Sequence, residues 1–440
     1  MNKTTSIMTL VALIAILTPP FVGAQQATLP TPDKFQVFNI VGAGASFPFP
    51  LIDLWRVEMK KVQSNVNINY ASIGSGGGVK NHIEKTVDFA ASDAPLTIDE
   101  QKLAPDTLTI PFTIGAITVS YNIPEFPNKG LKLTGQNIAD IYLGRITKWS
   151  DPAIAANNPG ISLPAKDIVP VRRSDGSGST FAFSDYLSTV SPEFNTVLGK
   201  GKSLGWTIGL GGKGNEGVTT TVKSTPYSVG YIELAYAAQN KMSYAYVQNA
   251  DKTAFIEPTL ESVASAAENV VYKLPSADYT DWSTVTMVNQ PGANSYPISS
   301  FSYMLIYEDL EKSVGNKVQA QAMLFTINWM LTDGQKFASK LLYVPLPDSV
   351  KKVGLNGLHM AKFNGEVLWP SSGLVSTPSG ATTPSETTVP KMTEKTPTNG
   401  SPEIPQWIRN NAKWWGEGQI SDKDFLQGIQ YLIKQGFLIV

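Results

Sequence analysis

Residues 107–121 read TLTIPFTIGAITVSY, and this stretch indicates the class of fold. Residues 107–110 and 116–121 are rich in β-branched, aliphatic and aromatic side chains, so we expect a strand at each. In other places apolar residues recur at helical spacing, which predicts helices over residues 136–143 and 318–325. Strands that alternate with helices predict an α/β fold with largely parallel sheets.

The composition is that of a globular protein and excludes several kinds of site. The chain has 440 residues, 42% of them hydrophobic, with a formal net charge of −1 and no cysteine. This length predicts two or three domains. Without cysteine there are no disulfides or thiolate ligands, and with only His82 and His359 a histidine-rich metal centre is not expected. No long basic run indicates a nucleic-acid partner. We expect neither a metal nor a cofactor.

Residues 1–24 have the pattern of a signal peptide. Lys3 supplies a positive charge, residues 7–17 form an apolar run, and residues 22–24 resemble a cleavage site of small side chains. The apolar run is shorter than the ~20 residues that a membrane-spanning helix needs. We therefore expect export to the periplasm or the extracellular cell surface, with no transmembrane segment in the mature chain. No cysteine is present to carry a lipid anchor, so the means of retention at the membrane stays open.

The composition changes near residue 371. Residues 371–403 are rich in Ser, Thr and Pro, which is typical of a disordered linker, and they contain the glycosylation sequon Asn399-Gly400-Ser401. Residues 404–440 hold three of the nine tryptophans and predict a small helical module. Two interpretations of this Trp-rich module stay open. Its aromatic residues form a small core, or they bind a partner in the cell envelope.

Three stretches combine glycine and serine with the start of a predicted helix. They are GAGASFP at 42–48, IGSGGG at 73–78 and RRSDGSGSTFAF at 172–183. A helix N-terminus presents unpaired N–H groups and a partial positive charge, and glycine lets its backbone approach a ligand. Three such ends that converged would surround an anion with donors. Each stretch alone is a weak indication of binding, because Ser-Gly turns and serine N-caps are common.

The third stretch adds a pair of charges. Arg173 has a planar fork that suits phosphate oxygens, and Asp175, two residues further on, is placed to hold that fork. A solvated ion pair on a loop is the alternative. For Asp93 the alternative to a role in binding is the capping of a helix or turn.

The sequence offers little for catalysis. Residues 209–214 match the pattern G-x-G-x-x-G but lack the usual preceding strand, and we interpret them as a flexible glycine turn. Ser177 does not lie in a G-x-S-x-G elbow, and two histidines leave little for a Ser-His-Asp triad. We therefore expect an anion to be held and not cleaved, and the protein not to be an enzyme.

Seven blocks of sequence resemble, in order, those of the periplasmic phosphate-binding proteins of phosphate-specific ABC transporters. The blocks are GAGASFPFP (42–50), IGSGGGVK (73–80), VDFAASDAPLT (87–97), IYLGRITKWSDPAIAANNPG (141–160), VRRSDGSGSTFAF (171–183), IGLGGKGNEG (208–217) and VGYIELAYA (229–237). The resemblance covers about residues 37–365. It implies a two-lobed type II periplasmic binding protein fold, in which two mostly parallel α/β lobes close on one phosphate at a hinge. The residues after 370 lie outside it.

We expect lobe 1 to comprise residues 37–114 and 298–370, and lobe 2 to comprise residues 115–297. The two crossings near Ile114 and Pro297 would form the hinge, because a buried anion can enter and leave only if the lobes part.

The resemblance also implies which residues bind phosphate. They are Ser46, Phe47, Ser75 and Asp93 from lobe 1, and Arg173, Ser177, Gly178 and Ser179 from lobe 2. Asp93 would accept a hydrogen bond from the ligand, and Asp175 would support Arg173 from behind. The family often has Thr at the positions of Ser46 and Ser179, and serine keeps the hydroxyl donor at both.

We therefore predict an exported solute-binding protein that delivers phosphate to the membrane subunits of an ABC importer. Two alternatives stay open: a secreted phosphatase-like enzyme, and a surface phosphate sensor or scaffold that acts through residues 404–440. Asp93 also predicts a preference among anions. Near neutral pH phosphate keeps a P–OH group that can donate to a carboxylate, whereas the oxygens of sulfate would face Asp93 acceptor to acceptor.

Overall fold

In the computed structural model of the protein, the two strand runs of residues 107–121 form one long strand. This strand, β4 (Thr107–Asn122), has 16 residues and is buried along nearly its whole length. Pro111 separates the two runs because it has no N–H for the ladder, and the register against the neighbouring strand shifts beside it, between Ser302 and Tyr303. The shift lets the strand continue past the proline, as β-bulges do.

Strand β4 takes part in both halves of the central sheet. Up to Ala116 it pairs antiparallel with β12 (Ser299–Tyr307), and from Ile117 it pairs antiparallel with β8 (Ser228–Glu233). The strand order is β2-β1-β3-β12-β4-β8-β6-β7, with β9 also paired to β4. The outer strands β2-β1-β3 and β8-β6-β7 pair in parallel. The two parallel groups are thus joined through β12 and β4 in one hydrogen-bonded path.

The remaining strands and the helices complete the two halves. The other strands of the central sheet are β1 (Phe38–Gly44), β2 (Val66–Ser72), β3 (Phe89–Ser92), β6 (Val169–Arg173), β7 (Leu210–Gly212) and β9 (Ser243–Tyr244). Two small sheets consist of β5 (Lys132–Leu133), β10 (Tyr246–Gln248) and β11 (Phe255–Ile256), and of β13 (Lys362–Phe363) and β14 (Glu366–Val367).

The helices on the side of β1 are α1 (Phe49–Val62), α2 (Ser75–Ile83), α3 (Ile98–Leu103), α11 (Lys317–Leu331) and α12 (Asp348–Met360), with the 3-10 helices η1 (Leu310–Lys312) and η2 (Asp333–Leu341). The other helices are α4 (Gly135–Tyr142), α5 (Pro152–Ala155), α6 (Gly178–Val190), α7 (Pro192–Val197), α8 (Gly214–Ser224), α9 (Leu234–Gln239) and α10 (Leu260–Glu268). The helices predicted over residues 136–143 and 318–325 correspond to α4 and α11.

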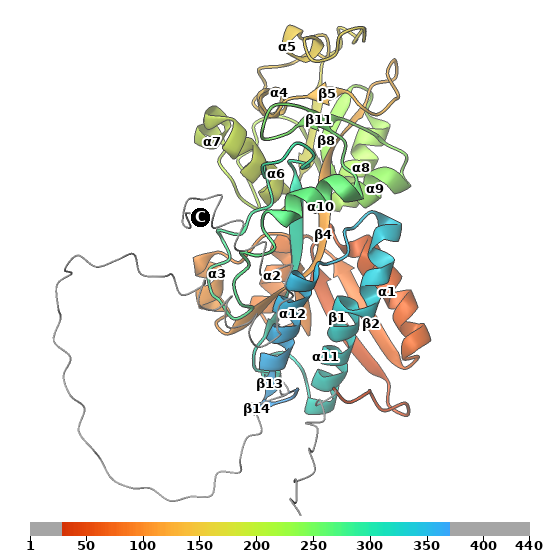
Figure 1. The fold of residues 1–440 in the computed structure, drawn as a ribbon, viewed down its shortest axis with the longest axis vertical. Helices are drawn as coiled ribbons and strands as arrows, with labels where there is room; N and C mark the ends of the chain where they lie inside the picture. The colour runs from red at the N-terminus through yellow and green to blue at the C-terminus, as the bar shows by residue number, and fades with distance from the viewer. Residues whose placement is uncertain (1–28, 370–440) are drawn as a thin grey trace, which may run out of the picture. The chain divides into compact units, whose positions relative to one another are not determined.

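Figure 1 shows β4 between two groups of elements, with α1, α2, α11 and α12 around one end and α6, α8 and α9 around the other. One continuous hydrophobic core extends along β4 through both groups. The predicted two-lobed α/β fold is confirmed. The residue ranges of the lobes stay a prediction, and the pairing partner of β4 changes close to the predicted crossing at Ile114.

The structure describes residues 29–369. The predicted signal peptide (1–24), linker (371–403) and Trp-rich module (404–440) lie outside the described residues, as does the last residue assigned to lobe 1. Within the described range, no helix has the length and apolar character needed to cross a membrane.

Candidate anion-binding site

Ser46 and Phe47 lie in the turn between β1 and α1, and both are buried. The Ser46 hydroxyl accepts hydrogen bonds from the backbone N–H and the side-chain amide of Asn215, each at 3.0 Å. The Phe47 carbonyl accepts from the Tyr343 hydroxyl at 2.6 Å. The backbone N–H groups of Ser46 and Phe47 have no acceptor within residues 29–369, so both donors are available to an anion.

Ser75 is the first residue of α2, and Asp93 directly follows β3. The Ser75 hydroxyl oxygen accepts from the N–H groups of Asp93 and Gly178, at 3.1 and 3.0 Å. It also donates to Asp93 Oδ2 at 3.4 Å, while Asp93 Oδ1 accepts from the Ser302 hydroxyl. The Asp93 carboxyl group is therefore held by two hydroxyl groups.

The proton affinity of Asp93 is unusual for an aspartate. Its side chain is buried, and burial raises the pKa of Asp93 to about 7, although the Ser302 hydrogen bond and the charge of Arg173 act in the opposite direction. At neutral pH the carboxyl group can therefore either keep or release its proton. It can accept a hydrogen bond in one form and donate one in the other.

Arg173 ends β6, and its side chain is buried against Asp175. Arg173 Nε donates to Asp175 Oδ1 at 2.8 Å, and Nη2 donates to Oδ2. Burial raises the pKa of Asp175, but the hydrogen bonds and positive charge of Arg173 outweigh burial and hold that pKa below its usual value. Gly214 N also donates to Asp175 Oδ1, at 3.0 Å. The predicted contact between the fork and Asp175 is present, and it leaves Arg173 Nη1 for another acceptor.

Ser177 and Ser179 lie at the start of α6, and both are buried. Ser177 is the N-cap, and its hydroxyl oxygen accepts from the backbone N–H of Thr180 at 3.0 Å. The Ser179 hydroxyl lies 3.5 Å from the side-chain amide nitrogen of Asn215. The capping bond uses an oxygen lone pair of Ser177, so its O–H remains free to donate.

Gly178 is where the starts of α6 and α2 meet. A Cβ atom at this position would lie 2.5 Å from Asp93 Cβ and 2.6 Å from Ser75 Oγ, so a larger residue would push the two helix ends apart. Beside it, Gly76 N donates to Gly176 O at 2.9 Å. The backbone of α2 and the backbone just before α6 are therefore in direct contact at this point.

The interpretation of residues 209–214 as a flexible glycine turn is wrong. Residues Leu210–Gly212 form β7, which pairs in parallel with β6, and Gly214 begins α8. Asn215 follows in the first turn, donates to Ser46 and accepts from Glu233 N at 2.9 Å. Asn215 was not among the predicted site residues, although its block also has small residues before a helix.

Glu233 is a second residue at this site that was not predicted from the sequence. It ends β8 and is fully buried, and its Oε2 accepts from Ala235 N at 2.9 Å. The hydroxyl of Tyr343 lies 3.1 Å from the same oxygen. Within the described residues, Glu233 Oε1 has no hydrogen-bond partner. Only its place in the block VGYIELAYA connected this residue with the site.

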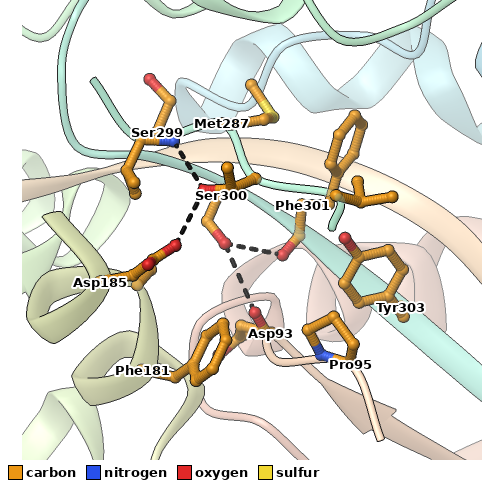
Figure 2. Close-up of a pocket in the computed structure, with 13 residues that line it drawn as sticks. Asp93, Pro95, Phe181, Asp185, Met287, Ser299, Ser300, Phe301 and Tyr303 are labelled. Carbon is orange, nitrogen blue, oxygen red and sulfur yellow. Dashed lines mark hydrogen bonds between the residues drawn. The ribbon is translucent and has the colours of Figure 1, made fainter. Parts of the chain in front are cut away.

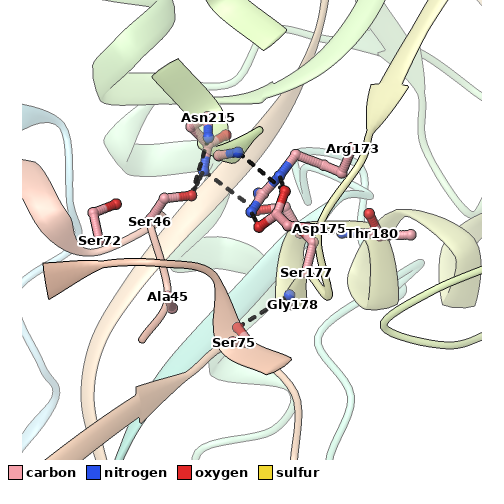
Figure 3. A network of polar contacts seen from close by, with 12 residues as sticks. Ala45, Ser46, Ser72, Ser75, Arg173, Asp175, Ser177, Gly178, Thr180 and Asn215 are labelled. Carbon is pink, nitrogen blue, oxygen red and sulfur yellow. Dashed lines mark hydrogen bonds and ion pairs between the residues drawn. The ribbon is translucent and has the colours of Figure 1, made fainter. Parts of the chain in front are cut away.

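Figure 3 shows Ser46 and Ser75 facing Arg173, Asp175 and the start of α6. The N-termini of α1, α2, α6 and α8 supply N–H groups and hydroxyl groups, and Arg173 supplies a positive charge. This combination suits an oxyanion. The structure brings all of the predicted site residues together, and their contact with phosphate stays a prediction.

Figure 2 shows a small cavity that Asp93 also borders, together with Phe181, Asp185 and Ser300. Its volume is about 20 Å³, which is enough for about one water molecule. Among the described residues, two aspartates and no cationic side chain border this cavity, so the converging helix N-termini suit an anion better than this cavity does.

The chain is similar in sequence to proteins of one family. The PBP superfamily domain matches residues 26–333. The phosphate-binding protein PstS of Pasteurella multocida (strain Pm70) is 42% identical over 315 residues, which cover 72% of this chain and 88% of that protein. The phosphate-binding protein PstS of Methanocaldococcus jannaschii is 37% identical over 344 residues, which cover 75% of this chain and 88% of that protein.

Solved structures share the fold. A putative phosphate ABC transporter substrate-binding protein from Clostridium perfringens, with bound phosphate, has a TM-score of 0.51 at 19% identity and covers 70% of this chain and 100% of that chain. A high-affinity periplasmic phosphate-binding protein, PfluDING, has a TM-score of 0.56 at 17% identity and covers 74% and 99%. The chain belongs to the PBP superfamily and, within it, to the family of phosphate-binding proteins.

Proposed function

We propose that this protein is an exported solute-binding protein that captures inorganic phosphate between its two lobes and delivers it to the membrane subunits of a phosphate ABC importer. Phosphate is supported as the ligand because the two relatives described above are phosphate-binding proteins. The observation that carries the proposal is the convergence of four helix N-termini beside the buried Arg173. Such a site provides many donors for one small anion.

The donors divide between the two lobes. The N–H groups of Ser46 and Phe47 are free to bind phosphate oxygens, and Arg173 Nη1 is available on the other side. The Ser75 hydroxyl and the Gly178 N–H now bind each other at 3.0 Å. A bound phosphate would insert between such pairs and replace direct contacts between the lobes by contacts to its own oxygens. The hydroxyl groups of Ser177 and Ser179 complete the proposed set.

The charges of the site favour an anion that carries a proton. Arg173 is largely neutralised by Asp175, so the helix N-termini supply much of the positive potential. Asp93 accepts a hydrogen bond from a P–OH group when it is ionised. Phosphate keeps such a group near neutral pH, and sulfate does not. The proposed site thus selects phosphate over sulfate at Asp93.

The movement that admits the ligand is proposed to occur where the chain crosses between the two lobes. Lobe 1 is proposed to comprise residues 37–114 and 298–370, and lobe 2 residues 115–297. At this level β4 exchanges one pairing partner for another. Bending there would part the helix N-termini without breaking either parallel group of strands.

Binding without hydrolysis is part of the proposal. His82 is buried, stacks on Tyr307 with a centroid distance of 4.4 Å, and contacts Thr107 Oγ1 at 2.8 Å. Burial lowers the pKa of His82 to about 4. A histidine with these contacts serves packing and does not support a role as a general base beside a phosphate. A role of residues 404–440 in binding an envelope partner remains a separate proposal, which a pull-down with the isolated module would test.

Isothermal titration of the purified protein with phosphate, arsenate and sulfate tests the proposed function. We expect tight binding of one phosphate per chain, binding of arsenate, which also keeps a proton, and weak or no binding of sulfate. A protein that binds sulfate as well as phosphate would contradict the assigned selectivity. Release of phosphate from a chromogenic monoester would support the phosphatase-like alternative.

A further inference from the structure

Phe47, Tyr343 and Glu233 form a chain of three oxygen atoms in which two contacts share one hydroxyl hydrogen. The Tyr343 hydroxyl oxygen lies 2.6 Å from the Phe47 carbonyl oxygen and 3.1 Å from Glu233 Oε2. A tyrosine hydroxyl donates only one hydrogen bond. If Glu233 were ionised, one of the two contacts would join two acceptors with no proton between them. With a proton on Glu233 Oε2, both contacts become hydrogen bonds.

The Phe47 carbonyl depends on this hydroxyl. Among residues 29–369, it accepts a hydrogen bond only from Tyr343. If Tyr343 instead donated to Glu233, the buried carbonyl would be left unpaired, which destabilises the closed state. The tyrosine therefore donates to Phe47, and the contact between Tyr343 and Glu233 needs a hydrogen from Glu233.

The surroundings of Glu233 disfavour its charged form. The titratable groups that face it are Asp93, Tyr236 and Tyr343, one of them acidic and the others neutral. Burial raises the pKa of Glu233 to about 8, and it outweighs the backbone N–H groups of Ala235 and Tyr236 and the hydrogen bond with Tyr343, all of which favour the carboxylate. Its unpaired Oε1 points to the same conclusion, because a buried carboxylate oxygen without a donor is costlier than the oxygen of a neutral acid.

We propose that Glu233 is a positioning residue that carries a proton while the two lobes are in contact, and that this proton holds the Phe47 peptide in the phosphate site. The proposal rests on the proposed function. By the proposed ranges Glu233 belongs to lobe 2, and Tyr343 and Phe47 belong to lobe 1. The chain of hydrogen bonds therefore forms when the lobes meet, and binding of phosphate is coupled to uptake of a proton by Glu233.

A neighbouring glutamate has similar contacts without this requirement. The Tyr236 hydroxyl lies 2.8 Å from both Ser46 O and Glu216 Oε1. The Ser46 carbonyl also accepts from Phe49 N at 3.3 Å, so Tyr236 is free to donate to Glu216. Glu216 is only partly buried. It therefore provides a matched control for the effect of replacing a glutamate beside the site.

The test compares the parent with Glu233→Gln and Glu216→Gln by isothermal titration with inorganic phosphate between pH 6 and 9. Glutamine is neutral and cannot titrate. The pKa of Glu233 is raised in the closed state, so its contribution to binding is present at low pH and is lost as pH rises through about 8. We expect the affinity of the parent relative to Glu233→Gln to fall with pH, by at most about tenfold per pH unit. The titration of phosphate is common to both proteins and cancels in this ratio.

Proton uptake is measured directly by repeating the titrations at pH 7.5 in buffers with different ionisation enthalpies. The parent and Glu216→Gln should take up more protons per phosphate than Glu233→Gln, by up to one. Equal uptake in the parent and Glu233→Gln would overturn the proposal. A parent that binds no phosphate would instead refute the proposed function, so the two failures are distinguishable.

A measurement on the unmodified protein keeps the test independent of how the variants fold. With glutamate labelled at its side-chain carboxyl carbon, the carbon chemical shifts of the phosphate-bound protein are followed against pH. One glutamate should titrate near pH 8. If every glutamate titrates below about pH 6 in this state, the proposal is wrong.

Discussion

Each lobe places one aspartate at the proposed phosphate site, and the two differ in what surrounds them: Asp93 is buried, whereas Asp175 is only partly buried. Lobe 1 places Asp93 among hydroxyl groups, and burial raises its pKa. Lobe 2 places Asp175 against Arg173, and the pairing holds its pKa down. The side of the site that lobe 2 supplies, here called the lobe 2 wall, therefore has a fixed pair of opposite charges, Arg173 and Asp175. On the lobe 1 wall, Asp93 can gain or lose a proton, so its charge can adjust to the protonation of the ligand. We therefore expect lobe 2 to contribute most of the affinity for the anion, and lobe 1 to determine the selectivity between anions.

Arg173→Ala should have the largest effect, because it removes the charge pair from the lobe 2 wall. Breaking a buried pair costs about 3–5 kcal/mol of unfolding free energy, since Asp175 would keep an unpaired charge. We expect phosphate affinity to fall by about a hundredfold, from the loss of charge-assisted bonds worth about 1.5–3 kcal/mol each. Denaturant unfolding and calorimetry measure the two effects.

Arg56→Ala is the control, because Arg56 also donates to an aspartate through Nε and Nη2, here both to Asp53 Oδ1 on the exposed surface. It should change stability by less than about 1 kcal/mol and leave phosphate binding intact. Arg173→Lys should recover only part of the affinity, since an ammonium group lacks the fork. If Arg173→Ala binds phosphate like the parent, the site is assigned to the wrong place.

Gly178→Ala tests whether the two walls must touch. The added methyl group would meet Asp93 Cβ at 2.5 Å, so the lobes could close only with a shift of backbone. Overpacking of this kind costs about 2 kcal/mol, which corresponds to about a thirtyfold loss of phosphate affinity. Gly205→Ala is the control, because nothing lies within 4 Å of the Cβ it would add. Equal affinities of the two variants would show that the contact between the walls is not needed.

Asp93→Asn removes the variable charge of the lobe 1 wall. An amide can turn its N–H toward an unprotonated oxygen, so we expect the preference for phosphate over sulfate to narrow by about tenfold. In the parent, the pKa near 7 implies that sulfate binding strengthens as pH falls through 7, where Asp93 gains a proton. The variant should lose this pH dependence. If it still rejects sulfate fully, Asp93 does not decide the choice of anion.

Lys202→Ala should have the smallest effect. Lys202 Nζ lies 2.6 Å from Glu100 Oε2 on α3, and this ion pair joins the lobes near the surface. Such pairs contribute about 0–1 kcal/mol, so phosphate affinity should fall by less than about fivefold, and less at high salt. If Lys202→Ala lowered the affinity as much as Gly178→Ala, contacts between the lobes near the surface would contribute as much to binding as the buried walls of the site.

Local patterns predicted much of this site. The starts of α1, α2 and α6 were recognised because glycine, serine and the apolar face of a helix lie within a few residues of one another. Asn215, Glu233 and Tyr343 were not, because their roles depend on partners more than a hundred residues away in most cases. Strand β4 was predicted as two strands, since a single sequence does not show that the register of β12 shifts to accommodate Pro111.

The position of β12 has a consequence for the order in which the chain folds. Strand β12 lies between β3 and β4, although residues 123–298 separate it from β4 along the chain. The part of the sheet that holds β1, β2 and β3 therefore cannot be joined to β4 until residues 123–298 have been synthesised. The strands β8, β6 and β7 lie on the other side of β4 and are synthesised before β12, so they can pair with β4 first. Contacts of such long sequence separation are slow to form, and the late insertion of β12 is expected to limit the rate at which the protein folds.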